Sequence, residues 1–187
     1  LMQTKSRGRA RIIYLLALAL AVGGMAMAKS GDQPFGGDRD VAFAEDLWDA
    51  MAGYESWPMR SDVYPGTSPH GEFLRMFYNV VNLDDEPYHV IVKDNYAGPD
   101  VGTVASAPAE HLQAVTVMVQ RRPGYDPANG DWFWVKYQPD GGIATNPRGR
   151  KLAGRVAKGA QEGCIACHGN AGGGDFVFSN DRRAGHH

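Results

Sequence analysis

The stretch EFLRMFYNVV, residues 72–81, has the alternation and the aromatic and β-branched content of a β-strand. Since successive side chains of a strand point to opposite faces, Phe73, Arg75 and Phe77 share one face and the even-numbered residues share the other. The connections between this stretch and the strand-like segments that follow are short enough for antiparallel pairing. Those segments, each bounded by turn-forming residues, are residues 88–93, 112–121 and 132–137.

Two helices are expected beside this sheet. Residues 41–54 repeat apolar side chains at helical spacing and carry acidic side chains on the opposite face. Residues 148–159 are basic, and we interpret them as a second, short helix. The predicted fold class is therefore α+β, mainly an antiparallel β-sheet with flanking helices.

Near the C-terminal end, Cys164, Cys167 and His168 form a C-x-x-C-H motif, and the chain has no other cysteine. Two thiols at this spacing can bond the vinyl groups of a haem, and the adjacent histidine then ligates the iron. The alternatives are a redox C-x-x-C pair and half of a zinc site. A redox pair is expected beside a βαβ pattern, and structural zinc needs four ligands from paired clusters. The motif therefore favours covalently attached haem c.

The number of axial ligands decides what such an iron can do. One histidine leaves the opposite position open for a small molecule, whereas a second axial ligand is typical of an electron carrier. None of the four methionines beyond the leader follows the motif as the axial methionine of a class I cytochrome c does; they are Met51, Met59, Met76 and Met118. We expect five-coordinate iron with His168 as its protein ligand.

The chain divides into a leader, a linker and one domain. Four basic side chains precede an apolar run at residues 12–22, and the small-residue pattern that ends at Ala28 predicts a signal peptide over residues 1–28. The alternative is an uncleaved anchor that holds the protein at the membrane. Residues 29–39, rich in Gly, Asp and Pro, predict a flexible linker, and residues 40–187 the haem domain. Either leader places the domain in the periplasm, where C-x-x-C-H haem attachment also occurs.

Composition limits the class of partner. The 187 residues are 43% hydrophobic with a net charge of −2, which fits one globular domain. The positive charge is concentrated at the extreme N-terminus, so nothing indicates nucleic acid as a partner.

Several segments together resemble the cytochrome P-460 family, which includes the cytochromes c′-beta. The resemblance implies a mostly β fold with flanking helices, unlike the helical fold of ordinary cytochromes c, and usually a homodimer. The segments that carry it are SPHGEF at residues 68–73, VIVKDNY at 90–96, GYDPANGDWFWVKY at 124–137, GCIACH at 163–168 and DFVFSND at 175–181.

The resemblance also assigns roles to single residues. It makes Lys93 the candidate for a covalent bond between a lysine and the porphyrin, and Arg75 the candidate for an arginine on the distal side of the haem. The family's proton-moving glutamate is replaced by Thr116, with Met118 the nearest alternative on the same strand face. Neither can act as a carboxylate base. Histidines that could substitute are His70, His89 and His111.

The implied function is binding and oxidation of hydroxylamine or related small nitrogen species, with electrons passed to a redox partner such as a soluble cytochrome. The alternative is nitric oxide binding or scavenging of the cytochrome c′-beta kind, for which Phe73 and Phe77 are candidates for an apolar cap over the iron. A third reading is an electron-transfer cytochrome, which requires six-coordinate iron.

Overall fold

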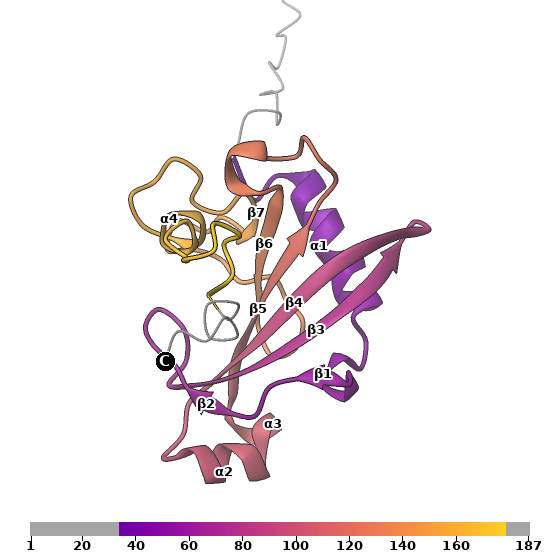
Figure 1. Cartoon of the computed structure of the whole chain (residues 1–187). Helices are drawn as coiled ribbons and strands as arrows, with labels where there is room; N and C mark the ends of the chain where they lie inside the picture. The colour runs from indigo at the N-terminus through magenta and orange to yellow at the C-terminus, as the bar shows by residue number, and fades with distance from the viewer. Residues whose placement is uncertain (1–33, 179–187) are drawn as a thin grey trace, which may run out of the picture.

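The computed structural model describes residues 34–178, so the predicted leader at residues 1–28 lies outside the described residues. A seven-stranded antiparallel sheet forms the body of the domain (Figure 1). Its strand order is β1-β3-β4-β5-β6-β7, and β2 also pairs with β3. The fold is α+β rather than a helical bundle, as the sequence predicts. The strands are β1 (Met59–Arg60), β2 (Tyr64–Pro65), β3 (Phe73–Leu83), β4 (Glu86–Tyr96), β5 (Leu112–Gln120), β6 (Trp132–Tyr137) and β7 (Ala153–Gly154).

The centre of the sheet is the long hairpin of β3 and β4. Asp84 and Asp85 join the two strands with positive φ angles of 50° and 63°. Positive φ at both central residues is the two-residue turn whose twist matches that of the flanking strands, and Asp tolerates it. The turn fixes the register, in which Met76 lies opposite Lys93 and Arg75 opposite Asp94.

Helix α1 (Asp38–Ala50) covers one face of the sheet. Its buried Ala44 and Leu47 pack on the inward side chains of the central strands, among them Val92 and Val117. The hydroxyl of Tyr137 in β6 donates a hydrogen bond to the carbonyl of Ala44, with an oxygen–oxygen distance of 2.6 Å. This apolar layer is the main core of the domain, and it leaves the opposite face of the sheet for other contacts.

The C-terminal segment covers that opposite face. Helix α4 (Cys164–His168) and the residues after it pack on Met118 and Trp134 through Ile165 and Val177. In Figure 1 this yellow segment and α1 lie on different sides of β6. The remaining helices are α2 (Val101–Ser106) and α3 (Pro108–His111), with 3-10 turns at Tyr54–Ser56 and Pro127–Asn129.

The structure corrects two details of the predicted elements. α1 begins at Asp38, three residues before its predicted start, and acidic Asp38 and Asp40 in its first turn suit the positive end of the helix dipole. The helix predicted at residues 148–159 is wrong, because part of this segment is strand β7, which pairs with β6. Glycines with positive φ, at Gly149 and Gly154 among others, break the helical path there.

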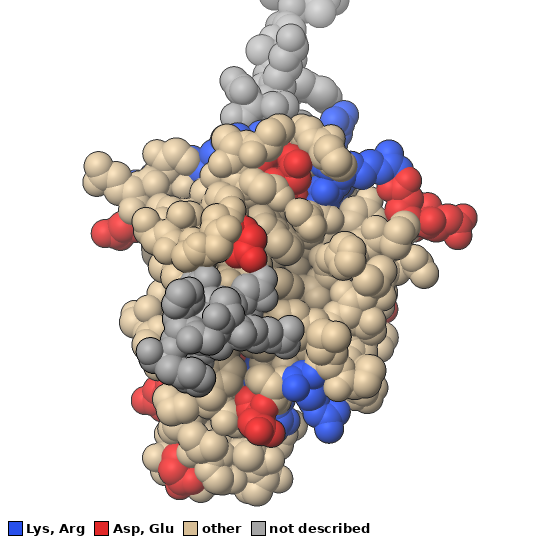
Figure 2. Space-filling model, in the orientation of Figure 1, with Lys and Arg blue, Asp and Glu red and all other residues tan. Residues whose placement is uncertain are grey.

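Surface charge shows no dominant sign on the face drawn in Figure 2, where basic and acidic side chains are interspersed. Within residues 34–178 no helix has the length and apolar character needed to cross a bilayer.

Candidate functional site

A cavity of about 940 Å³ lies between the sheet and the C-terminal segment, on the face away from α1. Its wall combines the sheet, the loop between β2 and β3, and α4. Cys164, Cys167 and His168 all line it, as do Lys93 and Thr116. The cavity therefore brings together the C-x-x-C-H motif and two residues that are some fifty to seventy positions earlier in the chain.

The sheet presents two cross-strand rows to this cavity. One row contains Met76, Lys93, Thr116 and Lys136, which lie opposite one another in successive strand pairs. Side chains directly opposite in antiparallel strands have Cβ atoms about 4.5–5.5 Å apart. Thr116 therefore lies between two lysines on one face of the sheet. The second row contains Tyr78, Ile91, Met118 and Trp134 and is mainly apolar.

The α4 side of the cavity carries the two cysteine thiols and the histidine of the C-x-x-C-H motif. Both cysteine thiols are free, and burial raises the pKa of Cys164. His168 is 7% exposed, and its Nδ1 lies 2.8 Å from the carbonyl oxygen of Phe176. Because a carbonyl can only accept, Nδ1 carries the proton and Nε2 keeps its lone pair. Burial also lowers the pKa of His168, so the imidazole is neutral and able to ligate a metal ion.

Two aromatic rings hold the His168 imidazole. The ring centre of Trp134 lies 4.8 Å from that of His168, and the ring centre of Phe178 lies 5.3 Å away. The segment 175–178 thus supplies both the Phe176 carbonyl and the Phe178 ring. These contacts fix the orientation of the imidazole before any cofactor binds.

The loop between β2 and β3 brings His70 into the cavity wall. Its Nδ1 lies 3.0 Å from Oδ1 of Asn95, and its ring centre lies 6.2 Å from that of His168. Burial lowers the pKa of His70 to about 4, with a further contribution from the charge of Lys93. His70 is therefore a neutral cavity residue, whereas His89 is exposed on β4 and His111 ends α3 outside the cavity wall.

Thr116 serves as a link between strands. Its hydroxyl donates to the carbonyl of Lys93 at 3.2 Å and accepts from the Asn95 side-chain amide at 3.1 Å. The hydroxyl proton is thus committed to the backbone, and Thr116 orients β4 against β5 beside Lys93.

Arg75 lies on the other face of the sheet, and this corrects its predicted place beside the haem. It pairs in register with Asp94, while the neighbouring Met76 pairs with Lys93 and faces the cavity. Phe77 on the same face is 1% exposed and belongs to the core beneath α1, and Phe73 packs at the edge formed with Tyr96 and Val104. None of these three side chains lines the cavity. Strand alternation therefore excludes the predicted phenylalanine cap as well.

Asp94 forms a buried polar site on the same side as Arg75. Its carboxylate is 3% exposed and accepts hydrogen bonds from the hydroxyls of Tyr54 and Tyr96, each at 2.7 Å. Burial raises its pKa to about 6, although the two hydroxyls and the charge of Arg75 oppose the shift. Arg75 thus has an electrostatic partner within the fold.

Sequence reasoning missed Lys136 and undervalued His70 and Trp134. The alternation of WFWVKY at residues 132–137 places Trp134 and Lys136 on one face, and that pattern could have identified Lys136. The position of His70 depends on a loop that lies against β4, and no local pattern in the sequence reports this contact.

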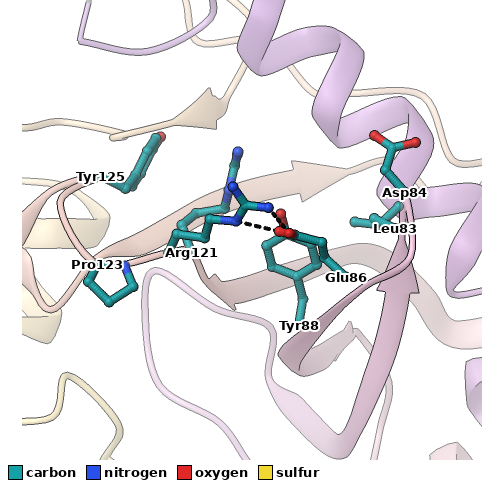
Figure 3. A pocket seen from close by; sticks show the side chains of 8 residues that line it. Leu83, Asp84, Glu86, Tyr88, Arg121, Pro123 and Tyr125 are labelled. Carbon is teal, nitrogen blue, oxygen red and sulfur yellow. Dashed lines mark hydrogen bonds and ion pairs between the residues drawn. The ribbon is translucent and has the colours of Figure 1, made fainter.

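A second cavity of about 370 Å³ lies at the β3–β4 turn (Figure 3). None of the motif residues lines it. Arg122 there forms an ion pair with Glu86. The guanidinium carbon of Arg121 lies 3.6 Å from the centre of the Phe43 ring, which is stacking of a cation on an aromatic face. These contacts account for Glu86, Arg121 and Arg122 among the charged side chains of this cavity.

The larger cavity fits a haem. Its volume is at the upper end of the range of about 300–1,000 Å³ typical of ligand sites. Its wall is predominantly apolar, both thiols of the motif reach it, and the unprotonated nitrogen of His168 is available. Cys164, Cys167 and His168 are the residues that would hold the group.

Comparison with known proteins gives one finding. The family model described as Cytochrome P460 matches residues 87–179. That span contains Lys93, Thr116, Lys136 and the whole C-x-x-C-H motif, and it begins after Arg75 and His70. No curated protein and no solved structure matches the chain.

Proposed function

The chain belongs to the cytochrome P460 family, whose members carry haem c, and from that premise we propose how this protein holds and uses the group. Cys164 and Cys167 form the two thioether bonds, and His168 binds the iron through Nε2. The hydrogen bond from Nδ1 of His168 to the Phe176 carbonyl supports this assignment, because it sets the tautomer that ligation needs. When bound, the haem supplies an iron that takes small ligands and exchanges electrons.

Lys93 is the proposed site of a third covalent bond to the porphyrin. Its place in the cavity wall, in the strand next to Thr116, supports this. A bond from Nζ to a porphyrin carbon replaces one N–H and one C–H, so it is a two-electron oxidation and requires an oxidant such as peroxide. Lys136 lies in the same row and is the matched comparison: a Lys93→Ala protein loses the bond, and a Lys136→Ala protein keeps it.

The ligand best supported is nitric oxide, a small neutral molecule. The observation that carries this choice is the chemistry of the cavity wall, which is mainly apolar and offers hydroxyls, amides, lysines and His70 as its polar groups. Binding of nitric oxide requires no proton transfer. The protein's part is to exclude water and to hold the His168 side of the iron rigid through Trp134 and Phe178.

Hydroxylamine oxidation is the second candidate, because one observation favours it. Oxidation of hydroxylamine releases protons, and the cavity wall supplies an unprotonated imidazole, His70, that can accept one, although burial lowers its pKa to about 4 and makes it a weak base. Thr116 cannot do so, since its hydroxyl proton is committed to the Lys93 carbonyl.

Two anaerobic measurements separate these candidates. Nitric oxide is titrated into the haem protein while the absorption spectrum is recorded, and hydroxylamine is supplied with an artificial electron acceptor. Stoichiometric nitric oxide binding without hydroxylamine turnover supports the first candidate. Turnover that His70→Ala abolishes and His89→Ala preserves supports the second. A protein that binds neither molecule contradicts both.

We further propose a periplasmic location, a homodimer and a soluble cytochrome as redox partner. The basic and apolar N-terminal sequence and the C-x-x-C-H motif support the location. The family resemblance supports the dimer. Cell fractionation and light scattering of the haem-loaded protein test the first two proposals, and electron transfer to a purified soluble cytochrome tests the third.

A further inference from the structure

His70 and His168 both line the cavity, and the separation of their ring centres equals the one that a shared metal ion would impose. Metal–imidazole nitrogen bonds are about 2.0–2.1 Å long, and the centre of a five-membered ring with bonds of about 1.33 Å lies about 1.1 Å from each ring atom. Two imidazoles on opposite sides of one metal ion therefore have ring centres about 6.3 Å apart. The observed separation is 6.2 Å, with the two ring planes at 86°.

Ordinary aromatic contacts also fall at about 4.5–7 Å, so hydrogen bonds must distinguish ligation from packing. Nδ1 of His168 donates to the Phe176 carbonyl, and Nδ1 of His70 lies 3.0 Å from Oδ1 of Asn95. Within residues 34–178 these are the only hydrogen bonds of the two rings. Both Nε2 atoms are thus without a proton and without a hydrogen-bond partner in that part of the chain.

The orientation of the Asn95 amide confirms that His70 is the donor. The Asn95 nitrogen donates to the carbonyl of Lys93 at 2.8 Å and to the carbonyl of Ala114 at 3.2 Å. The amide oxygen must then face the loop, where the backbone N–H of Gly71 also points at it from 3.4 Å. Asn95 is 4% exposed, so this orientation is fixed by the sheet. His70 therefore has the oriented tautomer typical of a metal-ligating histidine.

The loop that carries His70 is built against the end of β4. A Cβ at Gly71 would lie 2.6 Å from both the backbone nitrogen and oxygen of Tyr96, so only glycine permits this approach. The backbone N–H of Gly66 donates to the carbonyl of Glu72 at 2.7 Å and closes the loop. The N–H of His70 itself donates to the Thr67 carbonyl at 2.9 Å. His70 is consequently held toward the cavity and not left free on the surface.

We propose that His70 is a second axial ligand of the haem iron, opposite His168. This rests on the proposed haem function and replaces the expectation of five-coordinate iron with a resting six-coordinate state. Nitric oxide or hydroxylamine then binds only by displacing His70. If the displaced state is about 1% of the molecules, His70 weakens the apparent affinity for an external ligand about 100-fold.

The spin state of the ferric haem protein tests this assignment. The wild type is expected to show a low-spin electron paramagnetic resonance spectrum at neutral pH. His70→Ala should convert it to a high-spin spectrum, and added imidazole should restore the low-spin form. The control is His89→Ala, which removes an exposed histidine of β4 outside the cavity and should leave the spectrum unchanged. Nitric oxide should bind His70→Ala at least about tenfold faster than the wild type.

A high-spin wild type overturns the inference. So does a low-spin spectrum that survives His70→Ala, because it assigns the position to another group such as Met118 or Lys136. If His70→Ala fails to fold, double resonance on wild-type protein labelled with ¹⁵N-histidine still decides: two coupled imidazole nitrogens support the inference and one refutes it. Haem that is absent, or lost on denaturation, refutes the proposed function instead, so the two failures are distinguishable.

Discussion

The buried carboxyl of Asp94 makes the free energy of unfolding of this protein depend on pH. This carboxyl is buried, and its pKa is about 6 in the folded protein against 3.8 for an unperturbed aspartate. Because the folded pKa is raised, the group contributes no penalty below pH 3.8, where both states are protonated. The penalty grows between about pH 3.8 and pH 6, where the unfolded carboxyl has lost its proton and the folded one still holds it, and it is constant above pH 6, where folding buries a charge.

The magnitude follows from the shift. One pKa unit corresponds to about 1.4 kcal/mol, so Asp94 costs about 3 kcal/mol once it is fully ionised. Between pH 4 and pH 7 the change is about 2 kcal/mol, because the unfolded carboxyl is already partly ionised at pH 4. Asp94→Asn removes the charge, so its free energy of unfolding relative to the wild type should rise by that amount over this interval.

Urea unfolding of both haem-loaded proteins at pH 4, 5.5 and 7 measures the difference. Taking the difference between variant and wild type cancels every other titrating group. Asp100→Asn is the matched control of opposite sign, because hydrogen bonds from Thr103 lower the pKa of Asp100, and this variant should lose relative stability as pH rises. A constant difference between Asp94→Asn and the wild type across the three pH values would show that the Asp94 carboxyl does not titrate with a raised pKa in the folded protein.

Three further predictions concern the core, the face of Arg75 and the loop of His70. Leu47→Ala should lower the free energy of unfolding by about 2–5 kcal/mol, as for other fully buried leucines. Val80→Ala, at an exposed strand position, should change it by less than about 0.5 kcal/mol. Thermal unfolding measures both, and equal effects would contradict the assigned core. Arg75→Gln should leave nitric oxide binding unchanged and raise the pKa of Asp94, because Arg75 faces Asp94 and not the cavity. Carboxyl NMR measures this pKa. Impaired nitric oxide binding with an unchanged Asp94 pKa would restore the predicted distal role of Arg75. Gly71→Ala should push the loop off β4 and convert the iron toward high spin. The comparison is Gly102→Ala in α2, where φ is not positive and a Cβ would meet only the exposed Asp100 side chain. A low-spin Gly71→Ala protein would show that the loop does not hold His70.

The sheet could be predicted from the sequence because its strands have local patterns. Residues 72–81 and 132–137 alternate, and turn chemistry separates them from their neighbours. The failed helix at residues 148–159 has a basic composition but contains glycines whose positive φ angles belong to turns and to the pairing with β6. Composition does not report such pairing, because it is a contact between distant segments.

To predict which face of each strand lines the cavity, one must also know the register between the strands. Alternation alone placed Arg75 and Phe77 on one face, but it could not say whether that face was the one that carries Lys93. The two-residue turn at Asp84 and Asp85 sets this relation, and it opposes Met76 to Lys93. The position of His70 is harder still to predict, because it depends on the close packing of Gly71 against the end of β4, which is distant in the sequence.

The proposed haem site stands or falls on whether haem is covalently held at Cys164 and Cys167. Intact mass spectrometry of the denatured protein, expressed with a c-type haem maturation system, measures this in one step. The wild-type polypeptide should retain one haem after denaturation, and the thioether linkages should be absent from a Cys164→Ala, Cys167→Ala double variant. A wild-type polypeptide that carries no haem, or that releases it on denaturation, would rule out covalent attachment at these cysteines.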